Sequence, residues 1–196
     1  MGQQRLRMVV GLGNPGETYS RSRHNTGFMI VDALAEAYTI PLNKTKYDTV
    51  FGRGPIEGLD VLLAKPMAYM NRSGFPVQRL AHYFRILRED LLVVHDDIDL
   101  AIGRLKIKEK GGDAGHKGIR SMMNAFGGGD FTRLRVGIGR SESDTSVSDH
   151  VLGTFHTEEK EIMDIIIKRA KDAVVTTLSK GIAEGMNRFN NTTITT

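Results

Sequence analysis

The 196-residue sequence contains no cysteine, and this absence removes several kinds of chemistry at once. Disulfide bonds, zinc sites with thiolate ligands and a cysteine nucleophile are all excluded. A chain without disulfides fits a reducing compartment, so we expect a cytoplasmic protein. Long apolar runs are also missing, because none approaches the ~20 residues that a membrane-spanning helix needs. Arg5 and Arg7 are not followed by a long apolar region, so we expect no signal peptide.

What remains is the composition of an ordinary globular protein, with 40% hydrophobic and 26% charged residues. The length suits one compact domain over residues 1–196, with a polar tail expected to fray from about residue 188. Lysine and arginine number 27 against 23 acidic residues, giving a net charge of +4 and a pI near 9.4. This small excess permits a polyanionic partner without requiring one, so the positions of the charges matter more than their total.

Apolar periodicity predicts alternating strands and helices. Short apolar or alternating runs predict strands at 5–12, 48–65 (two strands joined at Glu57-Gly58), 91–94, 104–109 and 134–138. Apolar residues at roughly 3.6 spacing predict helices at 26–38, 73–85, 116–126 and 158–180. Strands that alternate with helices are typical of an α/β sheet covered by helices on both faces.

Two glycine-rich segments resemble nucleotide-binding motifs without matching them fully. The segment Gly11-Leu12-Gly13-Asn14-Pro15-Gly16 has the dinucleotide pattern G-x-G-x-x-G directly after a strand. In that motif the helix opens within the loop, whereas here helical periodicity begins about ten residues later, after a strong turn signal. The segment 112–118 lacks the G-K-[ST] ending of a P-loop. We therefore favour a structural turn over a cofactor site.

Polar side chains follow several of the expected strands. His24 and Asn25 follow the first strand, and His95-Asp96-Asp97 ends the strand at 91–94. Asn71 follows another strand, and His116-Lys117 opens a helix. Ligands of open α/β sheets bind at the carboxyl ends of strands, so these groups can converge on one crevice. A histidine base, a carboxylate that orients it and amide donors for an oxyanion are suited to hydrolysis by an activated water.

Each of these residues also has a simpler interpretation. A single histidine in a loop is more often structural or solvated than catalytic. The acidic cluster at 96–99 could cap a turn or bind Mg²⁺, although no suitably spaced histidine or glutamate partner is evident. Asn71 could cap the helix that follows it. Ser73 lacks the G-x-S-x-G context of an exposed nucleophile, so a serine mechanism is not expected.

Basic residues recur at period two in two of the expected strands: Arg104, Lys106, Lys108 and Lys110 in one, Arg133 and Arg135 in the other. On a strand such residues share one face, which points away from Leu105 and Ile107. A polyanion such as a nucleic acid is a reasonable counterpart, and a solvated ladder of surface charges is an equal alternative. The backbone N–H groups that open the helix at His116 add a further candidate phosphate site.

Taken together, the ordered segments resemble bacterial peptidyl-tRNA hydrolases. They are VVGLGNPGETYSRSRHNTGF, KPMAYMNRSG, LLVVHDDIDLAIGRLKIKEKGG, AGHKGIRS, FTRLRVGIGR and DHVLGTF, spread from residue 9 to about 155. The resemblance implies a three-layer α/β/α sandwich with a twisted mixed sheet. It also implies a monomeric cytoplasmic enzyme, without metal or cofactor, that cuts the ester between a peptide and the 3′ ribose of tRNA.

The resemblance also implies roles for individual residues. His24 would be the general base that activates water, held and polarised by Asp96. Asn14 would recognise the peptide main chain near the ester, and Asn71 would position the water or the ester carbonyl beside Met70. The other implied contacts are Tyr19 and Tyr69 with the 3′ CCA end of the tRNA acceptor, His116 on the peptide side, and Lys108 and Arg135 with a tRNA phosphate.

Lys117 departs from the family, which usually has asparagine at this position, and Tyr69 stands where phenylalanine is common. A lysine offers only donors on a long charged stem, so an amide role cannot be transferred to it. Our hypothesis is that Lys117 contacts a phosphate or the terminal ribose. The main rival to an enzyme is a catalytically impaired RNA-binding homologue, against which the presence of Asn14, His24, Asn71 and Asp96 argues. A nucleotide-dependent oxidoreductase and an esterase of small molecules are further rivals, and the second would have no use for a basic face.

Overall fold

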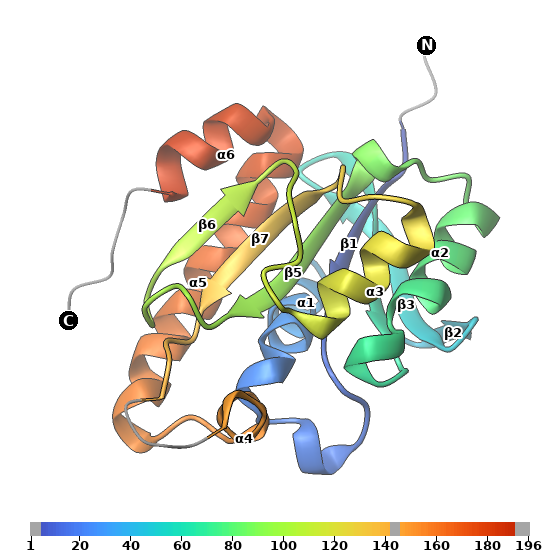
Figure 1. The fold of residues 1–196 in the computed structure, drawn as a ribbon. Coiled ribbons are helices and arrows are strands. Elements are labelled where there is room, and N and C mark those ends of the chain that lie inside the picture. The colour runs from blue at the N-terminus through green and yellow to red at the C-terminus, as the bar shows by residue number, and fades with distance from the viewer. Residues whose placement is uncertain (1–4, 142–145, 191–196) are drawn as a thin grey trace.

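The computed structural model describes residues 5–141 and 146–190, which form one seven-stranded mixed sheet between two layers of helices (Figure 1). The strand order is β2-β3-β4-β1-β5-β7-β6. Strands β4, β1, β5 and β7 run parallel, whereas β2, β3 and β6 pair antiparallel with their neighbours. The strands are β1 (Arg7–Gly11), β2 (Lys44–Lys46), β3 (Thr49–Ile56), β4 (Leu59–Pro66), β5 (Leu91–Asp97), β6 (Leu105–Lys108) and β7 (Thr132–Gly137).

Helices cover both faces of this sheet, which confirms the three-layer α/β/α sandwich. On one face lie α1 (Thr26–Ala37) and α5 (Thr157–Lys180), and on the other lie α2 (Gly74–Tyr83) and α3 (Lys117–Phe126). The short helix α4 (Val147–Leu152) stands near the carboxyl ends of the strands, and α6 (Ile182–Phe189) packs on α5 and β6. Within the described residues, no helix combines the length and apolarity needed to cross a bilayer.

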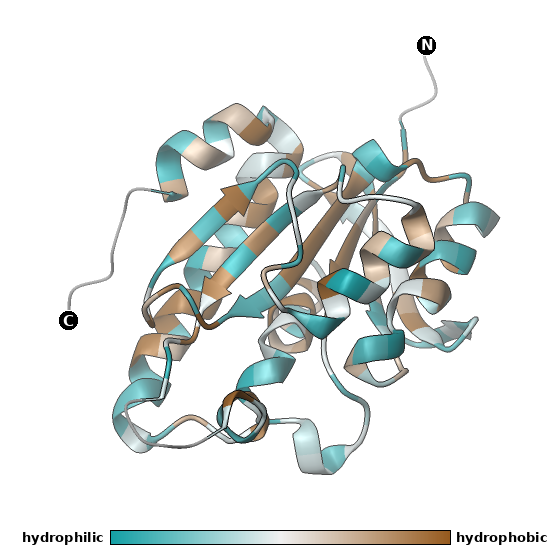
Figure 2. Cartoon of the chain, viewed as in Figure 1, coloured by the Kyte–Doolittle hydropathy of each residue, from teal (hydrophilic) through white to brown (hydrophobic). Residues whose placement is uncertain are grey.

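The alternation of side chains along the strands divides the core into two halves. On β1, Val9 joins the apolar cluster beneath α1 and α5, while Met8 and Val10 join the cluster beneath α2 and α3. All three side chains are fully buried. Figure 2 shows that the central strands are apolar along most of their length, while β5 becomes hydrophilic at its carboxyl end. Both faces are thus used for packing, and the polar end of the sheet remains for function.

The glycine loop after β1 has a packing role. A Cβ atom on Gly11 would lie 2.2 Å from the carbonyl oxygen of Gly27 in α1, so only glycine allows the strand and the helix to approach this closely. A Cβ atom on Gly13 would lie 2.7 Å from the Phe28 ring, so glycine is needed there as well. Helix α1 begins at Thr26, well after the loop, which agrees with the structural turn that we favoured.

Several short elements were not predicted. Strand β2 has only three residues, and α4 and α6 have six and eight, too few for a clear periodic signal. Strand β5 continues to Asp97, three residues past the predicted end, because its polar residues pair with β7. The tail expected to fray from residue 188 is helical to Phe189, and the Asn190 side chain hydrogen-bonds both the N–H and the carbonyl of Ile107. Residues 191–196 lie outside the described part of the chain.

Candidate active site

A cavity of about 770 Å³ opens at the carboxyl end of the sheet. It is bounded by the loops after β1, β4 and β5, by the segment that leads into α3, and by α4. Every side chain assigned to the site from the sequence lines this cavity: Asn14, Tyr19, His24, Tyr69, Met70, Asn71, Asp96, Lys108, His116, Lys117 and Arg135. The structure therefore brings these groups together, although it leaves their individual roles to be tested.

His24 lies in a short 3₁₀ turn, Arg23–Asn25, that leads into α1. The Asn25 side chain closes the loop on itself, because its Oδ1 accepts from the Asn14 backbone N–H at 2.8 Å and its Nδ2 donates to the Asn14 carbonyl at 2.9 Å. The Thr26 hydroxyl donates to the Arg23 carbonyl at 2.7 Å. These local bonds hold Asn14 and His24 on the same side of the cavity.

The imidazole of His24 is oriented by Asp96 at the end of β5. Nδ1 lies 2.9 Å from each carboxylate oxygen of Asp96, which is 1% exposed. Burial acts to raise the pKa of Asp96, but its interactions with His24 and His116 outweigh burial and hold that pKa well below its ordinary value. The carboxylate is therefore ionised and can only accept, so Nδ1 of His24 carries the proton. Nε2 is left as the unprotonated nitrogen.

His116 binds the same carboxylate from the other side. Its Nε2 lies 2.9 Å from Oδ1 of Asp96, and its Nδ1 accepts from the backbone N–H groups of Gly118 and Ile119 at 3.1 and 3.2 Å. Since Nδ1 is an acceptor, the proton must be on Nε2. The same bonds correct one expectation, because the two N–H groups that might have bound a phosphate at the start of α3 are already capped by the side chain of His116.

His95 is a site residue to which we assigned no role from the sequence. It is 3% exposed, its Nδ1 donates to the Asp96 carbonyl at 2.7 Å, and its ring meets His116 edge-on with centroids 4.7 Å apart. Burial holds the pKa of His95 well below its ordinary value. Its Nε2 has no hydrogen-bond partner among the described residues. The only signal in the sequence was its position directly before Asp96.

The amide of Asn14 is fixed by the next loop. Its Oδ1 accepts from the Met70 backbone N–H at 2.8 Å, so the donor end, Nδ2, is left for the cavity. Met70 belongs to a 3₁₀ turn, Met70–Arg72, and is 4% exposed against Gly118, where a Cβ atom would come within 2.4 Å of its sulfur. Asn71 is exposed in the same turn, and Tyr69, 59% exposed, stands before it.

The basic face on β6 and β7 is only partly available to a ligand. Lys106 and Lys108 are exposed and lie opposite Arg135 and Arg133 in the strand register. Arg135 forms an ion pair with Asp97. Arg133 is 2% exposed and donates to the carbonyls of Gly111 and Gly112, so the expectation that it faces a polyanion is wrong.

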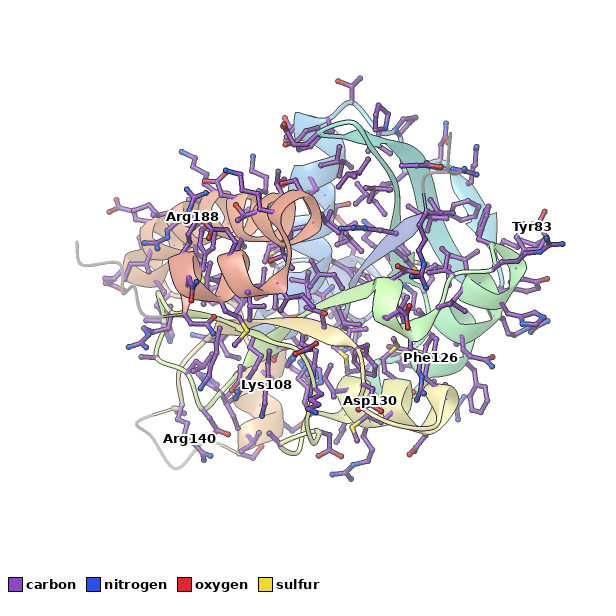
Figure 3. The ribbon with its side chains drawn as sticks, turned by 90° about the horizontal axis from the view of Figure 1, so that it is seen from above. Tyr83, Lys108, Phe126, Asp130, Arg140 and Arg188 are labelled. Carbon is purple, nitrogen blue, oxygen red and sulfur yellow. The ribbon has the colours of Figure 1, made fainter. Side chains whose placement is uncertain are left out.

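Two further cations flank the cavity. Arg140 lies on the same flank of the molecule as Lys108, opposite Tyr83 (Figure 3), and it is paired with Asp99. Lys117, the first residue of α3, is exposed and forms no ion pair with the described residues. Arg104 departs from the predicted face, because it precedes β6 and its guanidinium approaches the carbonyl of Asn190 at 3.5 Å.

Helix α4, which the sequence did not reveal, supplies apolar lining through Val147, Val151 and Leu152. The loop that carries His24 is tied to this region. The Arg23 N–H donates to the Gly153 carbonyl at 2.9 Å, and its guanidinium, 4% exposed, pairs with Glu159 in α5 at 2.6 Å.

The side chains of His24, Asp96 and His116 are grouped closely enough to hold a metal ion, with their ligand atoms within 4.8 Å of one another. Sequence spacing had suggested no histidine partner for the acidic cluster, so this grouping corrects that interpretation. In the tautomer that these hydrogen bonds favour, Nε2 of His116 carries a proton, which a metal ion would have to displace. Asp97 and Asp99 are each paired with an arginine. The arrangement is that of a hydrogen-bonded network.

A histidine–carboxylate pair in an open cavity at the carboxyl end of an α/β sheet is an arrangement suited to a hydrolase. A family model described as peptidyl-tRNA hydrolase matches residues 8–196. The chain belongs to the peptidyl-tRNA hydrolase family, as its sequence resemblance indicated, and it is a hydrolase that acts on the ester bond of peptidyl-tRNA.

The relatives match along nearly the whole chain. The peptidyl-tRNA hydrolases of Clostridium novyi (strain NT) and Bacillus subtilis (strain 168) are 43% and 42% identical over 183 residues, covering 93% of this chain and 97% of each relative. The crystal structure of peptidyl-tRNA hydrolase from Acinetobacter baumannii is 39% identical, covers 98% of both chains and has a TM-score of 0.91.

Proposed function

We propose that this enzyme cleaves peptidyl-tRNA with a water molecule that His24 deprotonates, without a metal ion. Nε2 of His24 takes a proton from water, and the water oxygen forms a bond with the ester carbonyl carbon. The bond between that carbon and O3′ of the terminal ribose then breaks, and the proton passes from His24 to O3′. The observation that carries this proposal is the Nδ1–Asp96 hydrogen bond, which leaves Nε2 as the basic nitrogen.

The neighbouring groups stabilise the charges that form during this reaction and position the substrate. Asp96 stabilises the imidazolium of His24 and keeps the ring in its tautomer. Asn14 presents the Nδ2 donor to a carbonyl of the peptide, since its Oδ1 is already engaged by Met70. Asn71, exposed at the cavity, positions the water or stabilises the developing oxyanion.

The RNA lies on the cationic side of the cavity in this proposal. Lys108 and Arg135 contact a phosphate of the acceptor end, and Lys117 contacts a phosphate or the terminal ribose. Tyr19, which is half-buried, and the exposed Tyr69 border the bases of the 3′ CCA end, to which their rings offer stacking surfaces. The enzyme acts as a monomer in the cytoplasm, and His116 stands on the peptide side.

The test compares an N-acetyl-aminoacyl-tRNA with the same aminoacyl-tRNA unblocked, in the presence of EDTA. We expect release of the blocked amino acid only. The His24→Asn variant keeps an amide donor near the position of Nδ1 but lacks the base, and its kcat should fall by about 10²–10⁴. His82→Asn, a change on the exposed face of α2, is the matched control and should be fully active.

Three outcomes would contradict parts of the proposal. Full activity of His24→Asn would remove His24 as the base. Activity that EDTA abolishes and added metal restores would contradict a metal-free reaction. Tight tRNA binding with no release from either substrate would indicate an RNA-binding homologue that has lost catalysis.

A further inference from the structure

The carboxylate of Asp96 receives hydrogen bonds from two imidazoles at once. Both His24 Nδ1 and His116 Nε2 lie 2.9 Å from Oδ1, and the two rings are 5.0 Å apart between centroids. Asp96 is 1% exposed, so solvent competes little with either donor. The carboxylate charge that orients His24 and stabilises its protonated form is therefore shared with His116.

We propose that His116 is a positioning residue that acts on His24 through Asp96, by donating an Nε2–H hydrogen bond to the shared Oδ1 oxygen. The positive end of the His116 N–H dipole is directed at Asp96 and lies close to the imidazolium that His24 becomes. It therefore competes with His24 for the negative charge of Asp96, and removal of this donor should favour protonation of the His24 ring. The inference deepens the proposed function and rests on it for the role of His24.

The surroundings of His116 favour the tautomer that this role needs, with the proton on Nε2. Its Nδ1 faces two backbone N–H groups, so a second proton on the ring would meet two donors. The buried edge of His95 packs against it, and His95 itself stays neutral because burial holds its pKa well below the ordinary value. The helix cap and the His95 contact fix both the plane and the tautomer of His116.

Other charged groups also face the cavity, and most are already paired. Asp97 is bound to Arg135, Asp113 to Arg120, and Arg140 to Asp99. The elements packed beside the His24 turn add Glu159, paired with Arg23, and His150, whose Nε2 lies 2.9 Å from the Gly139 carbonyl. Lys108, Lys117 and the buried Arg133 complete the set. Among the described residues, His116 is the one side chain besides His24 that donates to the Asp96 carboxylate, so His116 is the group to vary.

Two substitutions separate the two bonds of His116. His116→Asn places an amide oxygen where Nδ1 was, so it still caps Gly118 and Ile119 but cannot reach Asp96. His116→Gln places an amide N–H near the former Nε2, so it restores the donor to Asp96 and loses the cap. Each variant keeps one bond and removes the other, which makes each the control for the other.

The measurement is the pH dependence of kcat/KM, with the protonation of His24 followed by ¹⁵N-imidazole NMR in the free protein. For His116→Asn we expect the acid limb, and the pH at which the His24 ring gains its second proton, to move upward by about 0.5–1 unit. For His116→Gln both should stay at the wild-type position, although kcat and melting temperature fall with the loss of the cap. If both variants lower kcat without moving either pH value, His116 has a merely structural role and the proposal fails.

The NMR readout does not depend on turnover. A shift of the His24 titration in His116→Asn, in a protein that hydrolyses neither tRNA substrate, would support the coupling and contradict the proposed function. If the His24 titration is unshifted in a His116→Asn variant that still hydrolyses the blocked substrate, the result would contradict the coupling and support the proposed function.

Discussion

At the scale of single residues, the hydrogen-bond partners determine roles that residue types leave open. Asn14 could present either end of its amide to a substrate, and the Met70 N–H bond selects the donor end. His116 could be an acid, a base or a ligand, and two backbone N–H groups select the tautomer. The sequence predicted these residues as members of the site because each follows a strand or opens a helix at the carboxyl edge of the sheet. The amide orientation of Asn14 and the tautomer of His116 could not be predicted, because both depend on neighbours distant in the sequence.

The cations of the site provide a test at this scale. Lys108 forms no ion pair with the part of the chain that the structure describes, whereas Arg135 is paired with Asp97. We expect Lys108→Ala to reduce the slope of log Kd for tRNA against log salt concentration by about one. Lys117→Asn should have a similar effect if Lys117 contacts a phosphate. Lys44→Ala is the matched control, because β2 and β6 are opposite edges of the sheet.

Titration of tRNA binding over a range of KCl concentrations measures these slopes. Equal slopes for Lys108→Ala and Lys44→Ala would show that Lys108 does not contact the RNA backbone. A wild-type slope for Lys117→Asn would disprove a phosphate contact by Lys117 alone.

At the scale of elements, the site depends on how short turns are fastened to long helices. The 3₁₀ turn of His24 is held by Arg23, which reaches Gly153 after α4 and Glu159 in α5. Apolar periodicity predicted α1, α3 and α5 close to their observed bounds, because each buries one face against the sheet. It missed α4, whose six residues make less than two helical turns, and with it one wall of the cavity.

Loss of the ion pair between Arg23 and Glu159 should destabilise the folded protein. Arg23 is 4% exposed, so Arg23→Met removes the buried cation from Glu159, which keeps its hydrogen bond from the His156 N–H, and we expect the free energy of unfolding to fall by about 2–4 kcal/mol. Arg53→Met breaks the exposed pair with Asp60 and should cost less than about 1 kcal/mol. Urea denaturation of both variants measures the difference. Equal losses would show that the Arg23 pair contributes no more than a surface pair.

At the scale of the whole molecule, the parallel centre of the sheet determines where the site lies. The order β4-β1-β5-β7 brings residues from opposite thirds of the chain to one edge, and the alternation of strands and helices was enough to predict that edge. It was not enough to separate exposed from buried cations. Arg133 and Lys108 looked equivalent in the sequence, but Arg133 supports the loop at Gly111 and Gly112 from within.

Global stability should depend on pH through His95. Its pKa in the folded state lies well below the 6.5 of a free histidine, so the unfolded chain binds one more proton between these values. Stability is therefore complete above pH 6.5 and falls as the pH drops, by up to about 1.4 kcal/mol for each pH unit. Asp96, whose folded pKa is also lowered, loses its contribution only below its ordinary value of 3.8.

The His95→Asn variant removes the titratable imidazole and keeps an amide N–H that can donate to the Asp96 carbonyl. Its free energy of unfolding should be lower than that of the wild type at pH 7 but should change less between pH 6.5 and 5. Denaturant titrations at several pH values measure this dependence. Parallel pH profiles for the two proteins would show that another group causes the loss.

The anchor of Arg23 on Glu159 also has a consequence for biosynthesis. A ribosome completes the turn of His24 and the strand of Asp96 long before it reaches the start of α5. A nascent copy interrupted in that interval is itself a peptide esterified to tRNA, and it lacks the helix that fixes its own histidine. Such a product is not a partial enzyme but a substrate, which finished copies of the same protein must clear.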